Sequence, residues 1–378
     1  MDKERIENKS FEKGEKIERK KINPEDIRFT NIKVIGVGGG GCNAVSRLVQ
    51  DNIKGVDFIA INTDAQALLN LPENIYKLHI GKNTTKGLGA GSDTELGRKA
   101  AEESIEEIRK VISGADMVFI TAGMGGGTGT GASPIIAAVS KEMGILTVAI
   151  ITKPFSFEGK IRKIIAEEGI NNLKPNLDAM VIIPNDKLFS IAEENTTLID
   201  SFKLADTVIK HGVVGITEII LKPGLINIDF ADIQSILKDS GSCWMGIGTS
   251  KGVNRAEEAA LKAVESPLLE MKVEGAKRVL FNVIGGSDLT LTEIQKASNI
   301  IHQAVDPEAR IIFGATLDEN LKDEVKVILI ATEFPETPTK VDSKKDSLFG
   351  FSDTKPTFSI DIEDLPPLTR RRKILFTE

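Results

Sequence analysis

The sequence predicts an α/β protein in which a parallel sheet with helices on both faces is joined by a long helix to a smaller α+β domain. Three observations lead to this fold class. Apolar runs rich in Val and Ile alternate with segments of helical periodicity in the first half of the chain, as expected for strands buried on both faces of a parallel sheet. Two of these runs end directly in glycine-rich loops. Later strand-like runs follow one long helical segment and have shorter connections.

The elements of the first domain, residues 28–197, are expected to alternate along the chain. Strands are predicted at Ile32–Val37, Phe58–Ile61, Met117–Thr121, Leu146–Ile151 and Met180–Ile183. Helices are predicted between them at Ala44–Val49, Leu96–Ile112, Pro134–Met143 and Lys160–Leu173. Because a helix separates most successive strands, the strands should run parallel.

A central helix over residues 198–220 is expected to connect this domain to a C-terminal α+β domain at residues 221–334. The second domain is predicted to contain strands at Met245–Gly248, Val279–Ile284, Ile311–Ala315 and Val325–Ala331. Helices are expected near 254–265 and 290–304. The several late strands predict a second sheet.

The two ends of the chain differ from the middle in composition. Residues 1–27 and 335–378 each hold as many acidic as basic residues, so the formal charge of −7 belongs to the middle. Their polar, charged composition predicts a flexible N-terminal tail at 1–27 and a disordered linker at 335–360. Apolar residues return after Asp361, so 361–378 is expected to be a short peptide that binds a partner.

Composition excludes several classes of protein. Two Cys and three His in 378 residues leave no disulfide framework and no Cys-rich zinc site. The acidic balance disfavours general binding to nucleic-acid phosphates. No apolar stretch reaches the 18 residues of a membrane span, and the charged start lacks the apolar core of a secretory signal. A cytoplasmic location is therefore expected.

The first glycine-rich loop follows the strand Ile32–Val37 and opens a helix. Its run of glycines, Gly36-Val37-Gly38-Gly39-Gly40-Gly41, allows backbone N–H groups to approach an anion at a helix N-terminus. The same letters satisfy G-x-G-x-x-G at Gly36, Gly38 and Gly41, with Asp57 further on. An NAD-dependent Rossmann oxidoreductase is therefore an alternative to a mononucleotide-binding protein at this point.

A second loop favours a mononucleotide. The strand Met117–Thr121 leads into a run from Gly123 to Gly131, with a helix expected near Ser133-Pro134. Two glycine loops at strand ends of one sheet predict phosphates held from two sides, whereas a dehydrogenase needs one. No G-x-x-x-x-G-K-[ST] occurs, which excludes a P-loop NTPase. A third segment, Thr85–Ser92, is a candidate for a place near the terminal phosphate.

The seven residues Gly125-Gly126-Gly127-Thr128-Gly129-Thr130-Gly131 match the G-G-G-T-G-T-G signature of tubulins. With the upstream loop, the chain from about Ile32 to Phe334 closely resembles the tubulin/FtsZ family, in particular its bacterial cell-division GTPases. The resemblance implies a Rossmann-like parallel-sheet GTP-binding domain and assigns nucleotide contacts along it. These are Gly39, Gly40, Gly41, Cys42, Asn43, Gly89, Ala90, Gly91, Gly126, Gly127, Thr128, Gly129, Thr130, Glu158, Arg162, Asn185, Phe202 and Asp206.

Within this set, the resemblance places Glu158 and Arg162 near the ribose and phosphates, and Asn185 and Asp206 at the guanine base. The chemistry agrees, because guanine presents N1–H and N2–H₂ donors that a carboxylate can accept, whereas adenine presents an acceptor at N1. Phe202 lies four residues before Asp206 and is a candidate to stack on the base. A core position for Phe202 is an equal alternative.

The resemblance also gives a role to the loop after the central helix. Asn227, Asp229 and Asp232 would enter the nucleotide site of the next subunit and catalyse hydrolysis, so that GTP is hydrolysed only on head-to-tail assembly. From the residues alone, carboxylates favoured by a helix N-terminus are the better explanation of the two aspartates. Mg²⁺ would be held through the GTP phosphates, with no protein metal ligand assigned, and a monovalent cation near this loop is a second candidate.

The implied biology is a homopolymer that builds the ring of bacterial cell division at mid-cell, with GTP exchanged for GDP on hydrolysis. Residues 361–378 resemble the end peptide through which the family binds membrane-tethering and regulatory division proteins. Arg370–Lys373 is a weaker candidate for contact with anionic lipid.

Overall fold

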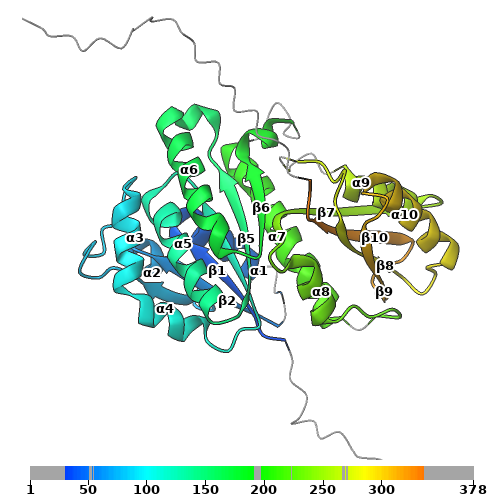
Figure 1. The fold of residues 1–378 in the computed structure, drawn as a ribbon, viewed down its shortest axis with the longest axis horizontal. Helices are drawn as coiled ribbons and strands as arrows, with labels where there is room; N and C mark the ends of the chain where they lie inside the picture. Colours follow the sequence, from blue (N-terminus) through cyan, green and yellow to red (C-terminus); the bar gives the residue numbers. More distant parts are fainter. Residues whose placement is uncertain are drawn as a thin grey trace, which may run out of the picture. The chain divides into compact units, whose positions relative to one another are not determined.

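The computed structural model describes residues 30–335, except for 51, 52, 54, 191–196, 223, 266–268 and 270. The strands of these residues form a ten-stranded sheet in the order β3-β2-β1-β4-β5-β6-β7-β10-β8-β9 (Figure 1). The predicted tail, linker and terminal peptide lie outside the described residues, apart from Pro335. No helix among the described residues has the length and apolar character to cross a bilayer.

The first six strands are parallel to their neighbours, as predicted. They are β1 (Ile32–Val37), β2 (Val56–Asn62), β3 (Tyr76–His79), β4 (Met117–Gly123), β5 (Leu146–Lys153) and β6 (Ala179–Pro184). Strand β3 was not predicted. It has four residues at the sheet edge and only one buried side chain, so it lacks the apolar run that marks the other strands.

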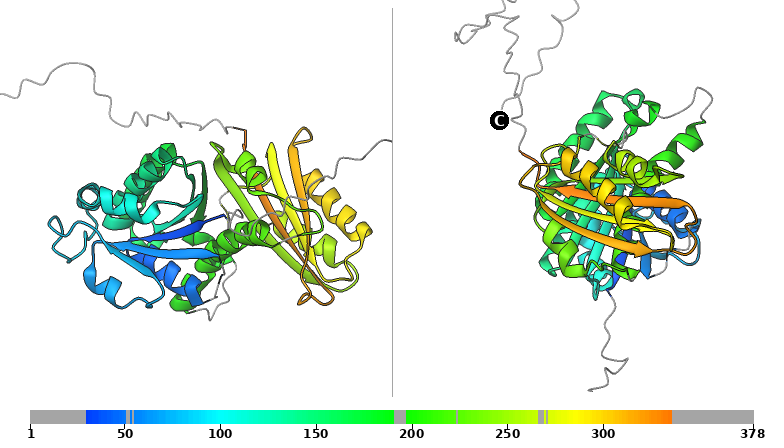
Figure 2. Two further views of the ribbon diagram at one scale, coloured as in Figure 1. Left: turned by 90° about the horizontal axis from the view of Figure 1, so that it is seen from below. Right: turned by 90° about the vertical axis from the view of Figure 1, so that its right-hand side faces the viewer.

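Helices cover both faces of these strands and give each face its own core (Figure 2). On one face lie α1 (Gly38–Gln50) and α7 (Leu198–Leu221), where Val34 packs in a cluster with Leu48 and Val213. The other face carries α3 (Thr94–Glu103), α4 (Ile105–Ile112), α5 (Gly127–Glu142) and α6 (Lys160–Leu173). The short α2 (Ala65–Leu69) follows β2 and is capped by Asp64.

Helices α1 and α5 begin earlier than predicted, at Gly38 and Gly127, because their first glycines are helical rather than part of the preceding loop. Helix α5 starts at Gly127, so Pro134 lies inside it. Close packing between α3 and α5 requires these glycines. A Cβ atom on Gly131 would lie 2.0 Å from the carbonyl oxygen of Thr94. A Cβ atom on Gly97 would lie 2.3 Å from the carbonyl oxygen of Gly127. The N-terminal half of α5 thus contacts α3 backbone to backbone.

The single helix predicted at Leu96–Ile112 is two helices, α3 and α4, separated at Ser104. The Ser104 backbone leaves helical geometry at φ −106° and ψ 20°. Its buried hydroxyl oxygen accepts a hydrogen bond from the Gly81 N–H at 3.0 Å. This tertiary contact anchors the start of the loop between β3 and α3, and local periodicity could not reveal it.

The second domain is an α+β unit. It contains α8 (Phe230–Leu237), β7 (Gly241–Lys251), α9 (Arg255–Val264), β8 (Arg278–Gly285), α10 (Leu291–Ala304), β9 (Arg310–Leu317) and β10 (Glu324–Thr332). Strand β10 is antiparallel to β7 and β8, while β8 and β9 are parallel. The start of β7 pairs with β6 through Ala179 and Gly241, which makes the sheet continuous.

A buried guanidinium ties the loops of this domain together. The Arg255 side chain is 5% exposed and pairs with Glu293 at 2.7 Å and with Asp288 at 2.6 Å. Asp323 adds a longer contact at 3.7 Å. The hydrogen bond from Arg255 lowers the pKa of Glu293 to about 2, against the opposing effect of burial. Arg255 therefore links the starts of α9 and α10 to the turn before β10.

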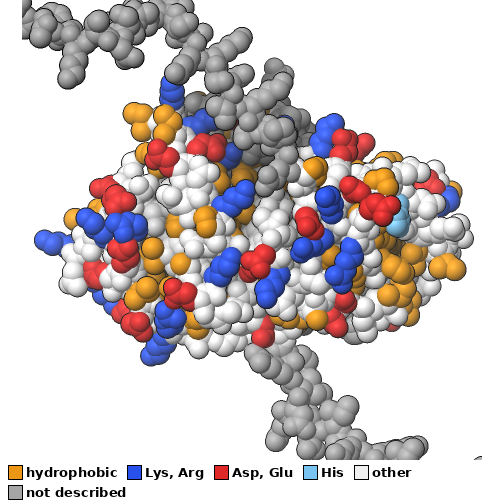
Figure 3. All heavy atoms as spheres, in the orientation of Figure 1, with side chains coloured by type: hydrophobic (Ala, Val, Ile, Leu, Met, Phe, Trp, Pro, Cys, Tyr) orange, Lys and Arg blue, Asp and Glu red, His pale blue; other side chains and the backbone are white. Residues whose placement is uncertain are grey.

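Charged side chains of both signs are interspersed on the face shown in Figure 3. No single-sign field dominates this view.

Candidate functional site

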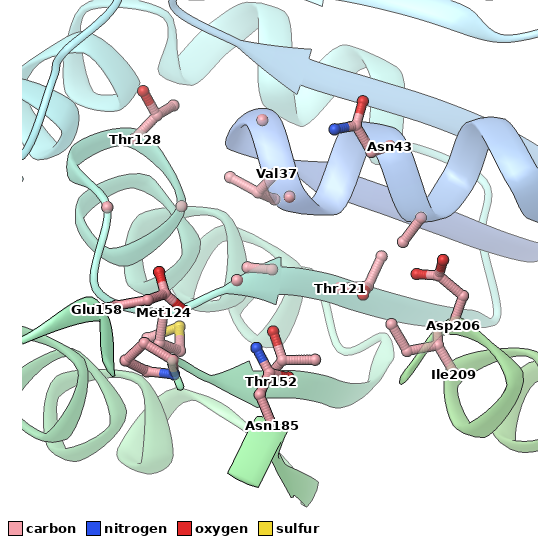
Figure 4. A pocket seen from close by; sticks show the side chains of 18 of the residues that line it. Val37, Asn43, Thr121, Met124, Thr128, Thr152, Glu158, Asn185, Asp206 and Ile209 are labelled. Atoms are coloured by element: carbon pink, nitrogen blue, oxygen red, sulfur yellow. The ribbon is translucent and has the colours of Figure 1, made fainter. Parts of the chain in front are cut away.

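A cavity of about 470 Å³ opens at the carboxyl ends of β1, β4, β5 and β6 (Figure 4). Its volume falls within the range of small-molecule sites. This edge is where ligands bind in open α/β sheets. Many of the predicted contacts line it, from six separate parts of the chain: Gly39, Gly40, Asn43, Gly91, Gly126, Gly127, Thr128, Gly129, Glu158, Arg162, Asn185 and Asp206.

One part of the cavity wall is made by the N-terminal turns of α1 and α5. Gly39 and Gly40 come from the first, and Gly126 to Gly129 from the second. Helix N-termini carry unpaired N–H groups and partial positive charge, so this wall suits the phosphates of a nucleotide. One donor is already used, because the Gly127 N–H donates to the Gly91 carbonyl at 2.8 Å. That bond fixes the third glycine segment against the second loop.

The glycines of this wall differ in what a side chain would meet. A Cβ on Gly39 or Gly126 meets no atom within 4 Å, whereas one on Gly131 would clash with the Thr94 carbonyl. We expect Gly39→Ala and Gly126→Ala to keep the melting temperature and to weaken nucleotide binding by at least about tenfold, since the methyl group occupies the phosphate approach. Gly131→Ala should instead lower stability by about 1–3 kcal/mol. Calorimetric titration with GDP and thermal melts separate the two effects.

Polar side chains from three elements meet elsewhere on the wall: Asn43 and Arg47 of α1, Asn185 after β6, and Asp206 of α7. The Asn185 side-chain oxygen is buried and has no hydrogen-bond partner among the described residues. Asp206 forms an ion pair with Arg47. Burial raises the pKa of Asp206, and Arg47 partly offsets this effect. An unpaired amide oxygen and a carboxylate on one wall can together bind the polar edge of a base.

Arg47 was missed by the sequence analysis, although a signal was present. It lies four residues after Asn43 on α1, and residues at this spacing share a helix face. Thr121, Thr152, Lys203 and Ile209 also line the cavity without having been predicted. Thr121 and Thr152 lie near the carboxyl ends of β4 and β5. Their place in the site depends on the order of the strands in the sheet, which the local sequence does not show.

Glu158 ends a short turn before α6, Arg162 lies in the first turns of α6, and the two side chains meet. Arg162 Nε lies 3.1 Å from Glu158 Oε2, and the other Glu158 oxygen accepts the Phe155 N–H at 2.8 Å. Both side chains line the cavity. The carboxylate is therefore held by two partners before any ligand binds.

Several predicted contacts do not line the cavity. The Cys42 thiol is buried, donates to the Gly36 and Ile61 carbonyls, and has its pKa raised by burial to about 12, so it is not a reactive thiolate. Thr130 Oγ1 accepts the Gly125 N–H at 2.8 Å and holds the second loop. Gly41, Gly89 and Ala90 do not line the cavity either. The Phe202 side chain lies outside the described residues.

The predicted hydrolysis loop lies between α7 and α8, away from this cavity wall. Asp229 and Asp232 cap α8 reciprocally: Asp229 Oδ1 accepts the Asp232 N–H at 2.8 Å, and Asp232 Oδ2 accepts the Asp229 N–H at 3.2 Å. The loop is anchored to β9 by two backbone hydrogen bonds between Ile226 and Ala315. Asn227 Oδ1 accepts the Gly224 N–H. None of Asn227, Asp229 and Asp232 lines the cavity.

Comparison with known proteins identifies the family. Residues 31–193 match the tubulin/FtsZ family GTPase domain, and residues 241–335 match the FtsZ family C-terminal domain. An empty FtsZ dimer from M. jannaschii is 45% identical, with a TM-score of 0.74, over 82% of this chain and 92% of that chain. The chain belongs to the tubulin/FtsZ family. The resemblance inferred from the glycine signature is thereby confirmed, as is the fold class.

A second FtsZ structure from M. jannaschii, that of a tryptophan-to-tyrosine mutant, is 47% identical with a TM-score of 0.74, covering 80% of this chain and 91% of that one. CetZ2 from Haloferax volcanii, solved as a GTPγS-bound protofilament, shares the fold at 20% identity and a TM-score of 0.69, over 81% of this chain and 95% of the other. Membership of the tubulin/FtsZ family makes this chain a GTPase that binds GTP and GDP. It also removes support for the oxidoreductase alternative.

Proposed function

We propose that this tubulin/FtsZ-family GTPase polymerises head to tail in a GTP-dependent manner and hydrolyses GTP between subunits. The observation that carries the proposal is the separation of two halves of a site. The glycine loops, Asn185 and Asp206 line one cavity, whereas Asp229 and Asp232 cap the start of α8 and do not line it. Two copies in head-to-tail contact would bring the halves together, and such a contact propagates into an open filament.

In the proposed cavity the phosphates lie on the N-terminal turns of α1 and α5, and the base lies against Asn185 and Asp206. The buried, unpaired side-chain oxygen of Asn185 gains a partner when a base binds. The Asp206 carboxylate accepts from guanine N1–H and N2–H₂, in exchange for part of its contact with Arg47. Glu158 and Arg162 border the ribose and phosphates.

The partner's Asp229 and Asp232 would act on the water that attacks the terminal phosphate. Their main work would be to orient the water and to help hold cations, because catalysis of phosphoryl transfer rests mostly on positioning and on neutralising charge. Mg²⁺ held through the phosphates would neutralise their charge.

The filament would form the cytokinetic ring at the mid-cell division site. Division proteins that tether it to the membrane would bind residues 361–378, beyond the linker 335–360 and outside the described residues. The domain division into 28–197, 198–220 and 221–334 belongs to the same proposal. It is supported by the two family matches, which lie on either side of α7.

Base recognition can be tested by changing the base. Asp206→Asn exchanges an acceptor for an amide donor, and xanthine differs from guanine by an acceptor in place of the N2–H₂ donor. We expect the variant to lose GTP affinity by about tenfold or more and to gain affinity for xanthosine triphosphate. Titration with both nucleotides measures this. Glu142→Gln, at an exposed carboxylate paired with Arg109 outside the cavity, is the control. Unchanged preference in Asp206→Asn would remove Asp206 from the base site.

A further inference from the structure

Thr63, which lies outside the glycine-rich loops, forms a side-chain hydrogen bond with Thr128 of the glycine signature. It follows β2, its side chain is fully buried, and it does not line the cavity. Its Oγ1 lies 2.6 Å from Oγ1 of Thr128, which does line the cavity. Figure 4 shows the Thr128 side chain on the signature loop. Thr63 is thus one hydrogen bond away from the wall proposed to hold phosphates.

The protons of these two hydroxyls can be counted. Among the described residues, Thr128 Oγ1 is the one hydrogen-bond partner of the Thr63 hydroxyl. Each hydroxyl has one proton to donate, and a buried donor left without an acceptor costs about 1–3 kcal/mol. If Thr63 donates to Thr128, the Thr128 proton is free and can point into the cavity. If Thr128 donated to Thr63, the buried Thr63 proton would have no acceptor.

The backbone around Thr63 holds this geometry. The Thr63 carbonyl oxygen lies 3.2 Å from His79 Nε2 and 3.3 Å from Thr85 Oγ1, which also lies 3.0 Å from the Gly81 carbonyl oxygen. The Ala65 N–H donates to the Gly87 carbonyl at 3.1 Å. The turn after β2 is therefore fixed to the third glycine segment on one side and to the signature loop on the other.

We infer that Thr63 is a positioning residue for phosphate binding: its buried hydroxyl donates to Thr128 Oγ1 and so directs the Thr128 proton at an anionic oxygen in the cavity. This rests on the proposed function, because it needs phosphates beside Thr128. A chain of two hydroxyls ending on an anion is polarised along its length, so each hydrogen bond strengthens the next. Loss of the first donor should therefore weaken the contact made by the second.

The test compares Thr63→Val, which has nearly the same shape but no donor, with Thr63→Ser, which keeps the hydroxyl. GTP, GDP and guanosine are titrated at protein concentrations below assembly. Thr63→Val should bind GTP, GDP or both about tenfold more weakly and guanosine equally well, and Thr63→Ser should restore the affinity. In the Thr128→Val background, Thr63→Val should have no further effect.

The outcomes separate the inference from the proposed function. A wild-type protein that binds neither GTP nor GDP contradicts the function itself. A wild-type protein that binds them, with Thr63→Val equally tight, overturns the inference alone. Equal weakening for guanosine would also overturn it, because a general distortion does not distinguish phosphates. If Thr63→Val does not fold, Thr63→Cys with its weak thiol donor takes its place and should show a smaller loss of the same sign.

Discussion

Replacing Asp232 with asparagine should give a protein that binds GTP and assembles, but hydrolyses GTP at least about 100-fold more slowly. The substitution removes the charge that orients water and cations and keeps an oxygen in nearly the same place. That oxygen can still accept the Asp229 N–H, so the cap of α8 is retained. The loss should therefore lie in turnover, with little change in stability. Phosphate release and sedimentation measured on the same sample report the two properties.

The matched control for this variant is Asp239→Asn. Asp239 is an exposed carboxylate paired with Lys141, and such a surface pair contributes little to stability. It should hydrolyse GTP at the wild-type rate. Normal hydrolysis by Asp232→Asn would contradict the assignment of this loop to a neighbour's site. Loss of both assembly and hydrolysis would instead indicate a role in the subunit contact.

The second large effect is expected in the α+β domain. Arg255→Met leaves the carboxylates of Glu293 and Asp288 without their buried partner, and breaking such a cluster costs about 3–5 kcal/mol. Chemical unfolding at pH 7 should show this loss. Lys251→Met, which removes an exposed partner of Glu324 in the same domain, should change stability by about 1 kcal/mol or less.

The effect of Arg255→Met should depend on pH in a defined direction. Arg255 lowers the folded-state pKa of Glu293 from 4.5 to about 2. A carboxylate with a lowered pKa stabilises the fold above its unfolded-state pKa, and this contribution disappears as the pH falls toward the folded-state value. The stability difference between wild type and Arg255→Met should therefore be full above about pH 5 and shrink between about pH 4.5 and 2. A difference that is constant over this range would exclude Glu293 as the main partner.

The features visible in the sequence were those determined by local pattern. The strand runs, the long helix and the glycine signature are each specified by neighbouring residues, so the fold class and the family followed from them. A glycine whose Cα packs against the backbone of another helix has no room for a side chain. The clash between a Cβ on Gly131 and the Thr94 carbonyl explains why this part of the signature tolerates no side chain.

The features that the sequence did not reveal depend on contacts between distant segments. The break at Ser104 follows from a hydrogen bond to Gly81, and the Arg47–Asp206 pair joins α1 to α7. Thr63 reaches Thr128 only because β2 lies beside β1, and β1 beside β4. The start of α5 at Gly127 overrides the usual place of proline in a first turn, because α3 packs against the glycines. Apart from the spacing of Arg47 four residues after Asn43 on α1, none of these has a local signature.

The most direct test of the proposed split site is the GTPase rate per subunit as a function of protein concentration. The proposal predicts a rate near zero in dilute solution, rising steeply once subunits assemble. Mixing Asp232→Asn with a variant defective in nucleotide binding, such as Gly39→Ala, should restore some hydrolysis, because each supplies the half that the other lacks. A rate per subunit that is constant from dilute monomer to assembled protein would contradict the account.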